Sequence, residues 1–280
     1  MSARTTGTVL DRIVADRRVR LAADRAARDE VALRALADRA RPPISFAARL
    51  REGRHATPSS RLRLVAEIKR ASPSKGVFDA DLDAVEQATQ YAEAGAAAIS
   101  ILTEPDYFKG SIEDLAAVCA AFDGDPDRPA LLRKEFIFDP YQVLEARAFG
   151  ADALLLIVML LEPDTLRDLL AQTRALGMEA LVEVHDEDEM RTAIEVGATV
   201  IGVNNRDLRT FNEDLGTFER LAALAPEGIT LVAESAIRAP EDARRMADAG
   251  AHALLVGEAL VKSGTVVETA RSLMLAEVNA

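Results

Sequence analysis

The chain alternates short apolar runs with longer amphipathic segments, and a Gly-Ala pair precedes four of those runs. Each pair follows a helical pattern and leads into a stretch such as AAISIL or DALLLIV. A glycine in that place suits the left-handed conformation that ends a helix, and a run that is apolar on both faces is typical of a buried parallel strand. The repeat therefore predicts strand and helix units in series. The pairs are Gly95-Ala96, Gly150-Ala151, Gly197-Ala198 and Gly250-Ala251, at intervals of 55, 47 and 53 residues.

Four further strands are predicted between these runs, at 63 to 69, 130 to 136, 179 to 184 and 229 to 235. Eight strands that alternate with helices over about 210 residues match a (β/α)8 TIM barrel, which typically takes about 250 residues. An open doubly wound sheet is the alternative, and it is less favoured because neither GxGxxG nor GxxxxGK[ST] occurs in the chain. The predicted fold class is therefore α/β, a TIM barrel.

Residues 1 to 60 precede the first predicted strand unit. Val9 to Ala40 carries apolar residues at helical spacing among Arg and Asp, and Arg41-Pro42-Pro43 follows. Proline cannot continue a helix, so one helix is predicted to end there. Because no linker-like composition follows, we expect an N-terminal helical extension (1 to 60) packed on the barrel (61 to 280) in a single domain. The same helix can also help to close the active-site face.

The charge balance narrows the choice of partners. The 34 Lys and Arg residues against 46 Asp and Glu residues give a formal net charge of −12, which disfavours nucleic acid and anionic membranes. No signal-peptide pattern is present, and the longest apolar run, Ala153 to Leu161, is far shorter than the roughly 20 residues of a membrane span. The single cysteine, Cys119, cannot form an internal disulfide. We therefore expect a cytoplasmic protein that binds neither nucleic acid nor membrane.

Lysine is scarce in this arginine-rich chain. Only five of the 34 basic residues are lysines. Lysine differs from arginine in having a pKa that falls readily on burial, so the retained lysines are candidates for lysine chemistry. Lys69 and Lys134 stand out because they lie in apolar strand patterns. The others are Lys75, Lys109 and Lys262.

Polar residues gather at the carboxyl ends of the predicted strands, where barrel enzymes carry their chemistry. Side chains alternate along a strand, so Glu67 and Lys69 point into the barrel mouth while their apolar neighbours pack on the helices. Three acids and two lysines in one mouth would perturb each other's pKa values, which favours an active site over a buried ion-pair network that only stabilises the fold. The other members are Lys134, Glu183, Asn204, Asn205, Glu234 and Ser235.

The loops after the seventh and eighth strands form a candidate phosphate site. Barrels often bind phosphate there through backbone N–H groups, and Gly257 allows close backbone approach. A glycine after a strand is also an ordinary turn residue, so the pattern is weak alone. The acidic run at 185 to 189 is predicted to begin a helix and not to bind metal. The candidate phosphate-binding residues are Ser235, Ala236, Gly257 and Glu258.

Several segments of the chain resemble indole-3-glycerol-phosphate synthases, and the signature segment VAEIKRASPS at 65 to 74 is the most specific. The others are LDRIVADRR near the start, SILTEPDYFKGS at 100 to 111, LLRKEFIFDPYQ at 131 to 142, LVEVHDEDE at 181 to 189 and IGVNNRDLRTF at 201 to 211. The resemblance implies a barrel enzyme of tryptophan biosynthesis that closes the indole ring. Its substrate would be a carboxyphenylamino-deoxyribulose 5-phosphate, its products indole glycerol phosphate, CO2 and water, and it would need no metal or organic cofactor.

The resemblance also implies roles for individual residues. Lys134 resembles the general acid of ring closure and Glu183 a partner acid or base in dehydration. Lys69 would contact the substrate carboxylate and is also a candidate for the second acid, while Glu67 would orient Lys134 by an ion pair and hold it protonated. The implied substrate contacts are Ser72, Phe136 on the anthranilate ring, Asn204 and Glu234 on hydroxyl groups, Arg206, and Ser235 with the Gly257 loop on the phosphate.

One residue departs from the family pattern, and one loop is a candidate for a moving part. The family commonly has Gly where this chain has Ala236, and we expect a backbone φ there that alanine tolerates. The polar, Gly-containing loop from Arg70 to Asp81, which carries Ser72, Pro73, Lys75 and Gly76, is a candidate lid over the site.

Other functions fit a phosphate-binding barrel. An isomerase of an aminoaldose phosphate, an aldolase that forms a Schiff base on Lys134, and a barrel that binds a metabolite without turnover are the alternatives. At 280 residues we expect one activity, in a monomer or a weak homo-oligomer.

Overall fold

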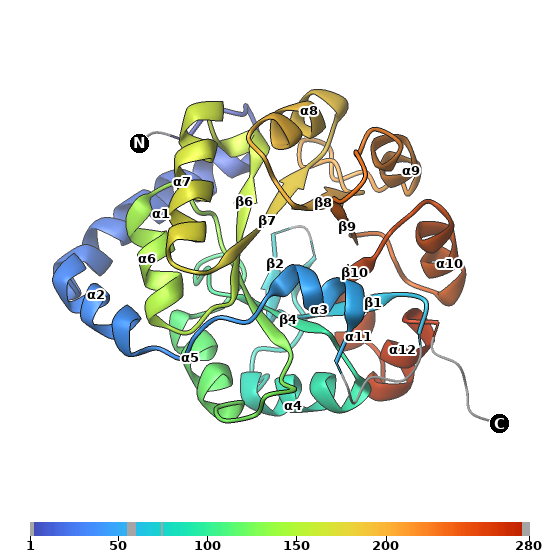
Figure 1. Ribbon diagram of the computed structural model, residues 1–280, viewed down its shortest axis with the longest axis horizontal. Coiled ribbons are helices and arrows are strands. Elements are labelled where there is room, and N and C mark those ends of the chain that lie inside the picture. The colour runs from blue at the N-terminus through green and yellow to red at the C-terminus, as the bar shows by residue number, and fades with distance from the viewer. Residues whose placement is uncertain (1–2, 55–59, 74, 276–280) are drawn as a thin grey trace.

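Eight parallel strands close into a barrel in the computed structural model, which describes residues 3–54, 60–73 and 75–275 (Figure 1). Around the barrel the order is β1, β10, β9, β8, β7, β6, β5 and β4. The last strand pairs with the first, with Ala66 opposite Val256, so the TIM-barrel prediction is confirmed and the open doubly wound sheet is wrong. The strands are β1 Arg63–Ile68, β4 Ala98–Leu102, β5 Ala130–Lys134, β6 Ala153–Ile157, β7 Glu179–Val184, β8 Val200–Asn204, β9 Thr230–Glu234 and β10 Ala253–Val256.

Helices follow the strands and cover the outside of the barrel (Figure 1). The glycine of each Gly-Ala pair has a positive φ, for example 97° at Gly95, where it ends its helix in the left-handed conformation. The repeat noticed in the sequence is therefore the joint between a helix and the next strand. The helices are α4 Ala84–Ala94, α5 Ile112–Ala121, α6 Pro140–Ala148, α7 Pro163–Ala175, α8 Glu187–Glu195, α9 Gly216–Ala222, α10 Pro240–Asp248, α11 Glu258–Val261 and α12 Val266–Leu273, with a short 3-10 turn η1 at Val158–Leu160.

Val9 to Ala40, the part of the N-terminal extension predicted to be one helix, forms two. α1 spans Val9–Ala27 and α2 spans Glu30–Arg39. Arg28 between them is extended, and the side chain of Asp29 caps α2 by accepting a hydrogen bond from the N–H of Ala32. Aspartate is among the residues preferred at a helix N-cap, so a new helix begins at this point although the helical spacing of apolar residues continues across it. α2 packs against α6 on the outside of the barrel (Figure 1).

A buried ion pair anchors α1 to the barrel. Arg17 Nε lies 3.3 Å from Glu135 Oε2, and both side chains are almost fully buried. Arg17 also donates to Asp24 on its own helix, at 2.8 Å. Glu135 directly follows β5, so this pair connects the extension to the end of a strand whose last residue is Lys134.

A third helix, α3 (Phe46–Glu52), covers the opposite, N-terminal end of the barrel. Phe46 and Leu50 are fully buried there. The N–H of Ala47 donates to Glu179 at the start of β7, and Arg51 donates to Thr230 at the start of β9. Because α3 covers the N-terminal end of the barrel, a cavity is expected at the end where the strands finish. Within the described parts of the chain, none of the helices combines the length and apolar character needed to traverse a bilayer.

Candidate active site

A cavity of about 590 Å³ opens at the C-terminal end of the barrel. Parallel strands present their carboxyl ends at this one rim, so residues far apart in the sequence meet there. Thirteen of the fourteen candidate site residues named from the sequence line it, Asn205 being the exception: Glu67, Lys69, Ser72, Lys134, Phe136, Glu183, Asn204, Arg206, Glu234, Ser235, Ala236, Gly257 and Glu258.

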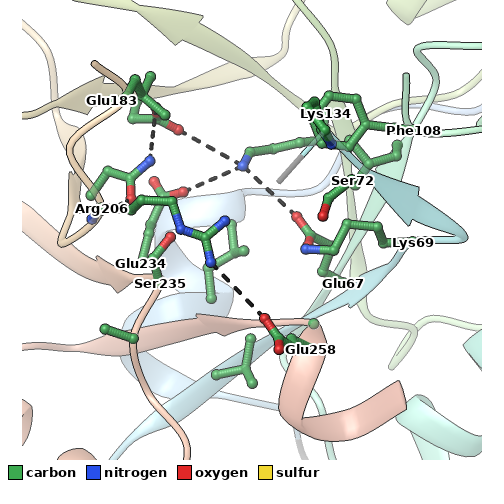
Figure 2. Close-up of a pocket in the computed structure, with 18 of the residues that line it drawn as sticks. Glu67, Lys69, Ser72, Phe108, Lys134, Glu183, Arg206, Glu234, Ser235 and Glu258 are labelled. Carbon is green, nitrogen blue, oxygen red and sulfur yellow. Dashed lines mark hydrogen bonds and ion pairs between the residues drawn. The ribbon is translucent and has the colours of Figure 1, made fainter. Parts of the chain in front are cut away.

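Lys134 lies at the centre of this cavity, among carboxylates from three other strands (Figure 2). Its Nζ is 3.8 Å from Glu67 Oε2 and 3.8 Å from Glu183 Oε2. The third carboxylate, Glu234, is the nearest, with Oε2 at 3.4 Å. On its other side, Glu183 accepts a hydrogen bond of 3.2 Å from Nδ2 of Asn204. One ammonium group thus contacts three acids and remains within reach of a ligand in the cavity.

The three acids do not share one protonation state. Burial would raise the pKa of Glu183, but His185, Lys134 and Asn204 favour its charged form and lower the pKa to about 2. Burial raises the pKa of Glu234 to about 8, against the attraction of Lys134 and together with repulsion from Glu183 and Glu67. Burial would lower the pKa of Lys134, yet its three carboxylates raise it above the ordinary value. The site thus combines a lowered pKa at Glu183 with raised pKa values at Glu234 and Lys134, which suits one base and two acids.

Lys69 and Glu67 form a close ion pair at the end of β1. Burial would raise the pKa of Glu67, but Lys69 and Lys134 outweigh it and lower the pKa below its usual range.

Two glycines make room for the buried acids. A Cβ on Gly257 would lie 2.6 Å from Oε1 of Glu67, and a Cβ on Gly202 would overlap the carboxylate of Glu234. Gly257 thus accommodates a neighbouring acid, a role that the sequence pattern did not predict.

The turn after β9 has a backbone conformation that corrects our expectation for Ala236. Ser235 and Ala236 have φ of 64° and 65°, the left-handed region, which costs a residue with a Cβ about 1–2 kcal/mol. Asn205 holds this turn, because its backbone N–H and its Nδ2 both donate to the carbonyl of Glu234, at 2.9 and 3.1 Å. The expectation of a φ that suits alanine is therefore wrong. Asn205 holds the turn and lies outside the lining of the cavity.

Glu258 brings a negative charge to the rim near this turn. Its carboxylate accepts from Lys75 at 2.9 Å and from Lys262 at 2.7 Å, and it lies 4.0 Å from Arg206 (Figure 2). Burial would raise the pKa of Glu258, but the two lysines lower it to about 2. The side chain is thus an anion, and only its backbone N–H suits a phosphate.

The candidate lid contains a short hairpin. β2 (Ala71–Ser72) pairs antiparallel with β3 (Gly76–Val77), and the Lys75–Glu258 pair joins this hairpin to the rim of the cavity. Ser72 Oγ is buried without a hydrogen-bond partner among the described residues. Ser74, the last residue of the signature segment, lies outside the described residues.

Apolar side chains form part of the lining of the cavity, here called the apolar wall, and only Phe136 among them was predicted from the sequence. The rings of Phe108 and Phe136 lie 6.0 Å apart at 46°, a geometry typical of attractive aromatic pairs. Leu155 and Ile157 alternate along β6 and also line the cavity, so strand alternation was a usable signal for them. The remaining apolar residues of the wall come from α1 and from the rim: Val9, Leu10, Ile13, Leu102, Leu208 and Phe211.

The acidic run after β7 begins α8, as the sequence predicted. Asp186 is the N-cap and accepts from the N–H of Glu189. No group of three or more His, Cys, Asp or Glu suited to a metal ion is found among residues 3–54, 60–73 and 75–275. His185 is a site residue that the sequence did not predict. Its ring turns back onto Glu183, with Nε2 3.2 Å from Oε1, and the position of His185 in the acidic run did not indicate this contact.

Comparisons with known proteins agree on one family. A family model described as indole-3-glycerol phosphate synthase matches residues 10–273. An indole-3-glycerol phosphate synthase of Roseiflexus sp. (strain RS-1) is 48% identical over 95% of this chain and 98% of its own length. A multifunctional tryptophan biosynthesis protein of Schizosaccharomyces pombe is 47% identical over 83% of this chain, which spans 30% of that longer protein.

A likeness to solved structures extends to the fold alone. The 3-hexulose-6-phosphate synthase of Salmonella typhimurium superposes with a TM-score of 0.62 at 13% sequence identity, over 76% of this chain and 97% of that one.

Proposed function

The chain belongs to the indole-3-glycerol phosphate synthase family of tryptophan biosynthesis, and from this premise we propose how its cavity closes the indole ring. The isomerase, the Schiff-base aldolase and the non-catalytic barrel are not favoured by this membership. The proposed substrate is 1-(2-carboxyphenylamino)-1-deoxyribulose 5-phosphate. The proposed reaction class is that of a carboxy-lyase, because the carboxylate leaves as CO2 when the ring closes. We expect it to act in the cytoplasm, as a monomer or weak homo-oligomer.

Ring closure needs an acid at the ketose oxygen. The ring carbon that bears the carboxylate attacks the ketose carbon, and a proton must reach the oxygen as the new C–C bond forms. Lys134 is the proposed donor because it is cationic, central and held by three carboxylates at 3.4–3.8 Å. This placement of one ammonium among Glu67, Glu183 and Glu234 is the observation that carries the proposal. Lys69, at the end of β1, is the proposed partner of the substrate carboxylate until CO2 leaves.

Dehydration needs a base and an acid at once. Loss of water breaks the C–O bond, which requires a proton on the leaving oxygen and removal of a proton from the five-membered ring. Glu183 is the proposed base because its lowered pKa keeps it ionised. Lys134 or Lys69 would protonate the leaving group, while Glu234, protonated below its pKa of about 8, and Asn204 would bind hydroxyl groups of the substrate.

The remaining cavity residues suit the two ends of the substrate. The Phe108–Phe136 pair and the residues of α1 form an apolar surface for the anthranilate ring. Arg206 is oriented by Glu213, with Nη2 2.5 Å from Oε1, and is the proposed contact for the charged part of the substrate. Backbone N–H groups at Ser235, Ala236, Gly257 and Glu258 are the proposed phosphate contacts. The buried Ser72 hydroxyl, which has no hydrogen-bond partner among the described residues, is a further proposed substrate contact.

The test is direct turnover. Purified protein is given the carboxyphenylamino substrate, and indole fluorescence and CO2 release are recorded together. Lys134→Ala should lower kcat by about 10²–10⁴-fold, the usual contribution of a general acid, while the affinity for a non-reacting reduced substrate analogue is largely kept. Lys109→Ala is the matched control, because Lys109 lies outside the lining of this cavity, and it should behave as wild type.

Three outcomes would contradict the proposal. They are no turnover by well-folded protein, a Lys134→Ala variant that keeps its kcat, and borohydride trapping of a substrate adduct on Lys134, which would indicate an aldolase.

A further inference from the structure

His185 lies two residues beyond Glu183, just after β7 ends, and its ring is held between two carboxylates. Nε2 is 3.2 Å from Glu183 Oε1, and Nδ1 is 3.0 Å from Glu189 Oε2. The side chain is only 6% exposed. A carboxylate beside each ring nitrogen favours the doubly protonated, cationic form of His185.

The second carboxylate fixes the ring in place. Glu189 lies in the first turn of α8, and its Oε2 accepts from the backbone N–H of His185 at 2.8 Å as well as from the ring. An acid that binds one ring nitrogen sets the orientation of the other, so Glu189 holds Nε2 within ion-pair distance of Glu183, although Nε2 makes no hydrogen bond to the described residues. The chain of contacts then runs from Glu189 through His185 and Glu183 to Lys134.

The 3-10 turn η1 adds apolar residues to the elements that hold the ring. β7 and α8 supply the two acids, and η1, which packs on both, supplies Val158, Met159 and Leu160, all buried and apolar. Beyond Glu183 lie Lys134 from β5 and Asn204 from β8. Burial would lower the pKa of His185, but its two glutamates raise it to about 10.

We propose that His185 is a positioning residue: as an imidazolium fixed by Glu189, it keeps Glu183 ionised and aimed at Lys134 and the substrate. This rests on the proposed role of Glu183 as the base. Asn204 and His185 both contact Oε1 of Glu183, while Lys134 lies at Oε2, and the imidazolium supplies a positive charge that does not depend on Lys134. Glu183 would thus stay ionised when Lys134 gives up its proton.

The charge state is tested by NMR on the full chain. Long-range ¹H–¹⁵N spectra of the three histidines should show both ring nitrogens of His185 protonated at pH 8. His252, whose pKa burial lowers, should be neutral there. Glu189→Gln should bring the titration of His185 into a lower pH range. A neutral His185 at pH 8 would overturn the proposal.

The positioning role is tested by kinetics of His185→Leu and His185→Gln. Both variants remove the charge, so kcat should fall by about tenfold or more while KM changes little, and kcat should decline on acidification about one to three pH units earlier than in wild type, the usual effect of losing an opposite charge within 4–6 Å. His185→Gln keeps a donor and should retain the higher kcat of the two. A folded His185→Leu variant with the wild-type kcat and pH profile would overturn the proposal.

Two parallel variants separate the possible failures. Met190→Ala removes a buried apolar side chain of α8 and should lower Tm with no change in the pH profile. If it shifts the profile as His185→Leu does, the effect is only structural and the proposal is wrong. Glu183→Gln that keeps wild-type activity would overturn both the proposed base and this inference. An inactive Glu183→Gln beside unaffected His185 variants would overturn the inference alone.

Discussion

The carboxylate of Glu67 fills the space that a side chain on Gly257 would take. The two residues lie side by side because each comes directly after one member of a residue pair between the neighbouring strands β1 and β10. A Cβ on Gly257 would lie 2.6 Å from Oε1 of Glu67. The φ of Gly257 is −124°, so the backbone itself does not require glycine. The requirement is steric and comes from an acid of the candidate active site.

Gly257→Ala should therefore disturb the site through Glu67. The added methyl displaces the carboxylate that pairs with Lys69 and Lys134, at a cost of about 1–3 kcal/mol in the free energy of unfolding, as for other overpacked positions. We expect kcat to fall as well, and both are measured by urea unfolding and the turnover assay. Gly264→Ala is the matched control, because a Cβ there meets nothing within 4 Å. Equal effects of the two substitutions would contradict the steric explanation.

Ala236→Gly should stabilise the protein, an unusual result for a change to glycine. The φ of 65° at Ala236 costs alanine about 1–2 kcal/mol, partly offset by the greater freedom of glycine in the unfolded chain. A gain of up to about 1 kcal/mol in the free energy of unfolding is expected. Ala247→Gly, inside α10, should do the opposite and cost about 0.5–1 kcal/mol. A loss of stability in both variants would argue against strain at position 236.

Glu234→Gln should change how stability depends on pH. The folded pKa of Glu234 is about 8 against 4.5 for the free group, so the folded chain binds this proton more tightly. The contribution of Glu234 to the free energy of unfolding is therefore full below pH 4.5 and is lost as the pH rises toward 8. Glutamine mimics the protonated acid, so the variant should gain on wild type by at most about 1.4 kcal/mol per pH unit over this window. Unfolding curves from pH 5 to 8.5 that stay parallel would contradict the raised pKa.

Arg17→Met should weaken both the fold and the binding of substrate. It leaves the buried carboxylate of Glu135 without its partner from α1, and breaking a buried pair in this way typically costs about 3–5 kcal/mol. Because Leu10 and Ile13 of the same helix line the cavity, KM should rise more than kcat falls. Arg20→Met is the control on the same helix, since its pair with Asp106 is partly exposed and should be worth less than about 1 kcal/mol. Similar losses from both substitutions would contradict the anchoring role of Arg17.

Lys75→Ala should loosen the hairpin that we propose as a lid. The substitution removes the contact between Lys75 and Glu258 on the rim, so chymotrypsin should cut at Phe78 faster than in wild type. A substrate analogue should protect wild type against this cleavage. Lys109→Ala serves as the control, because it leaves that pair intact. Cleavage that is equal with and without the analogue in wild type would count against a lid.

The spacing of apolar and polar positions determined most of the barrel. The eight strands follow from runs such as 153–157, and the carboxyl ends of parallel strands meet at one rim in any TIM barrel. That geometry is why Lys134, Glu183 and Glu234, although up to 100 residues apart, could be assigned to one cavity from the sequence. The scarcity of lysine was informative in the same way, because three of the five lysines line the cavity and a fourth, Lys75, pairs at its rim.

The tertiary structure decided what depends on contacts between distant residues. The left-handed turn at Ala236, held by Asn205, and the fit of Glu67 against Gly257 arise from such contacts. Periodicity in a sequence reports which face of an element is buried. It carries no information on which side chain from another element fills the space beside it, and that choice decides the charge on each acid in the site.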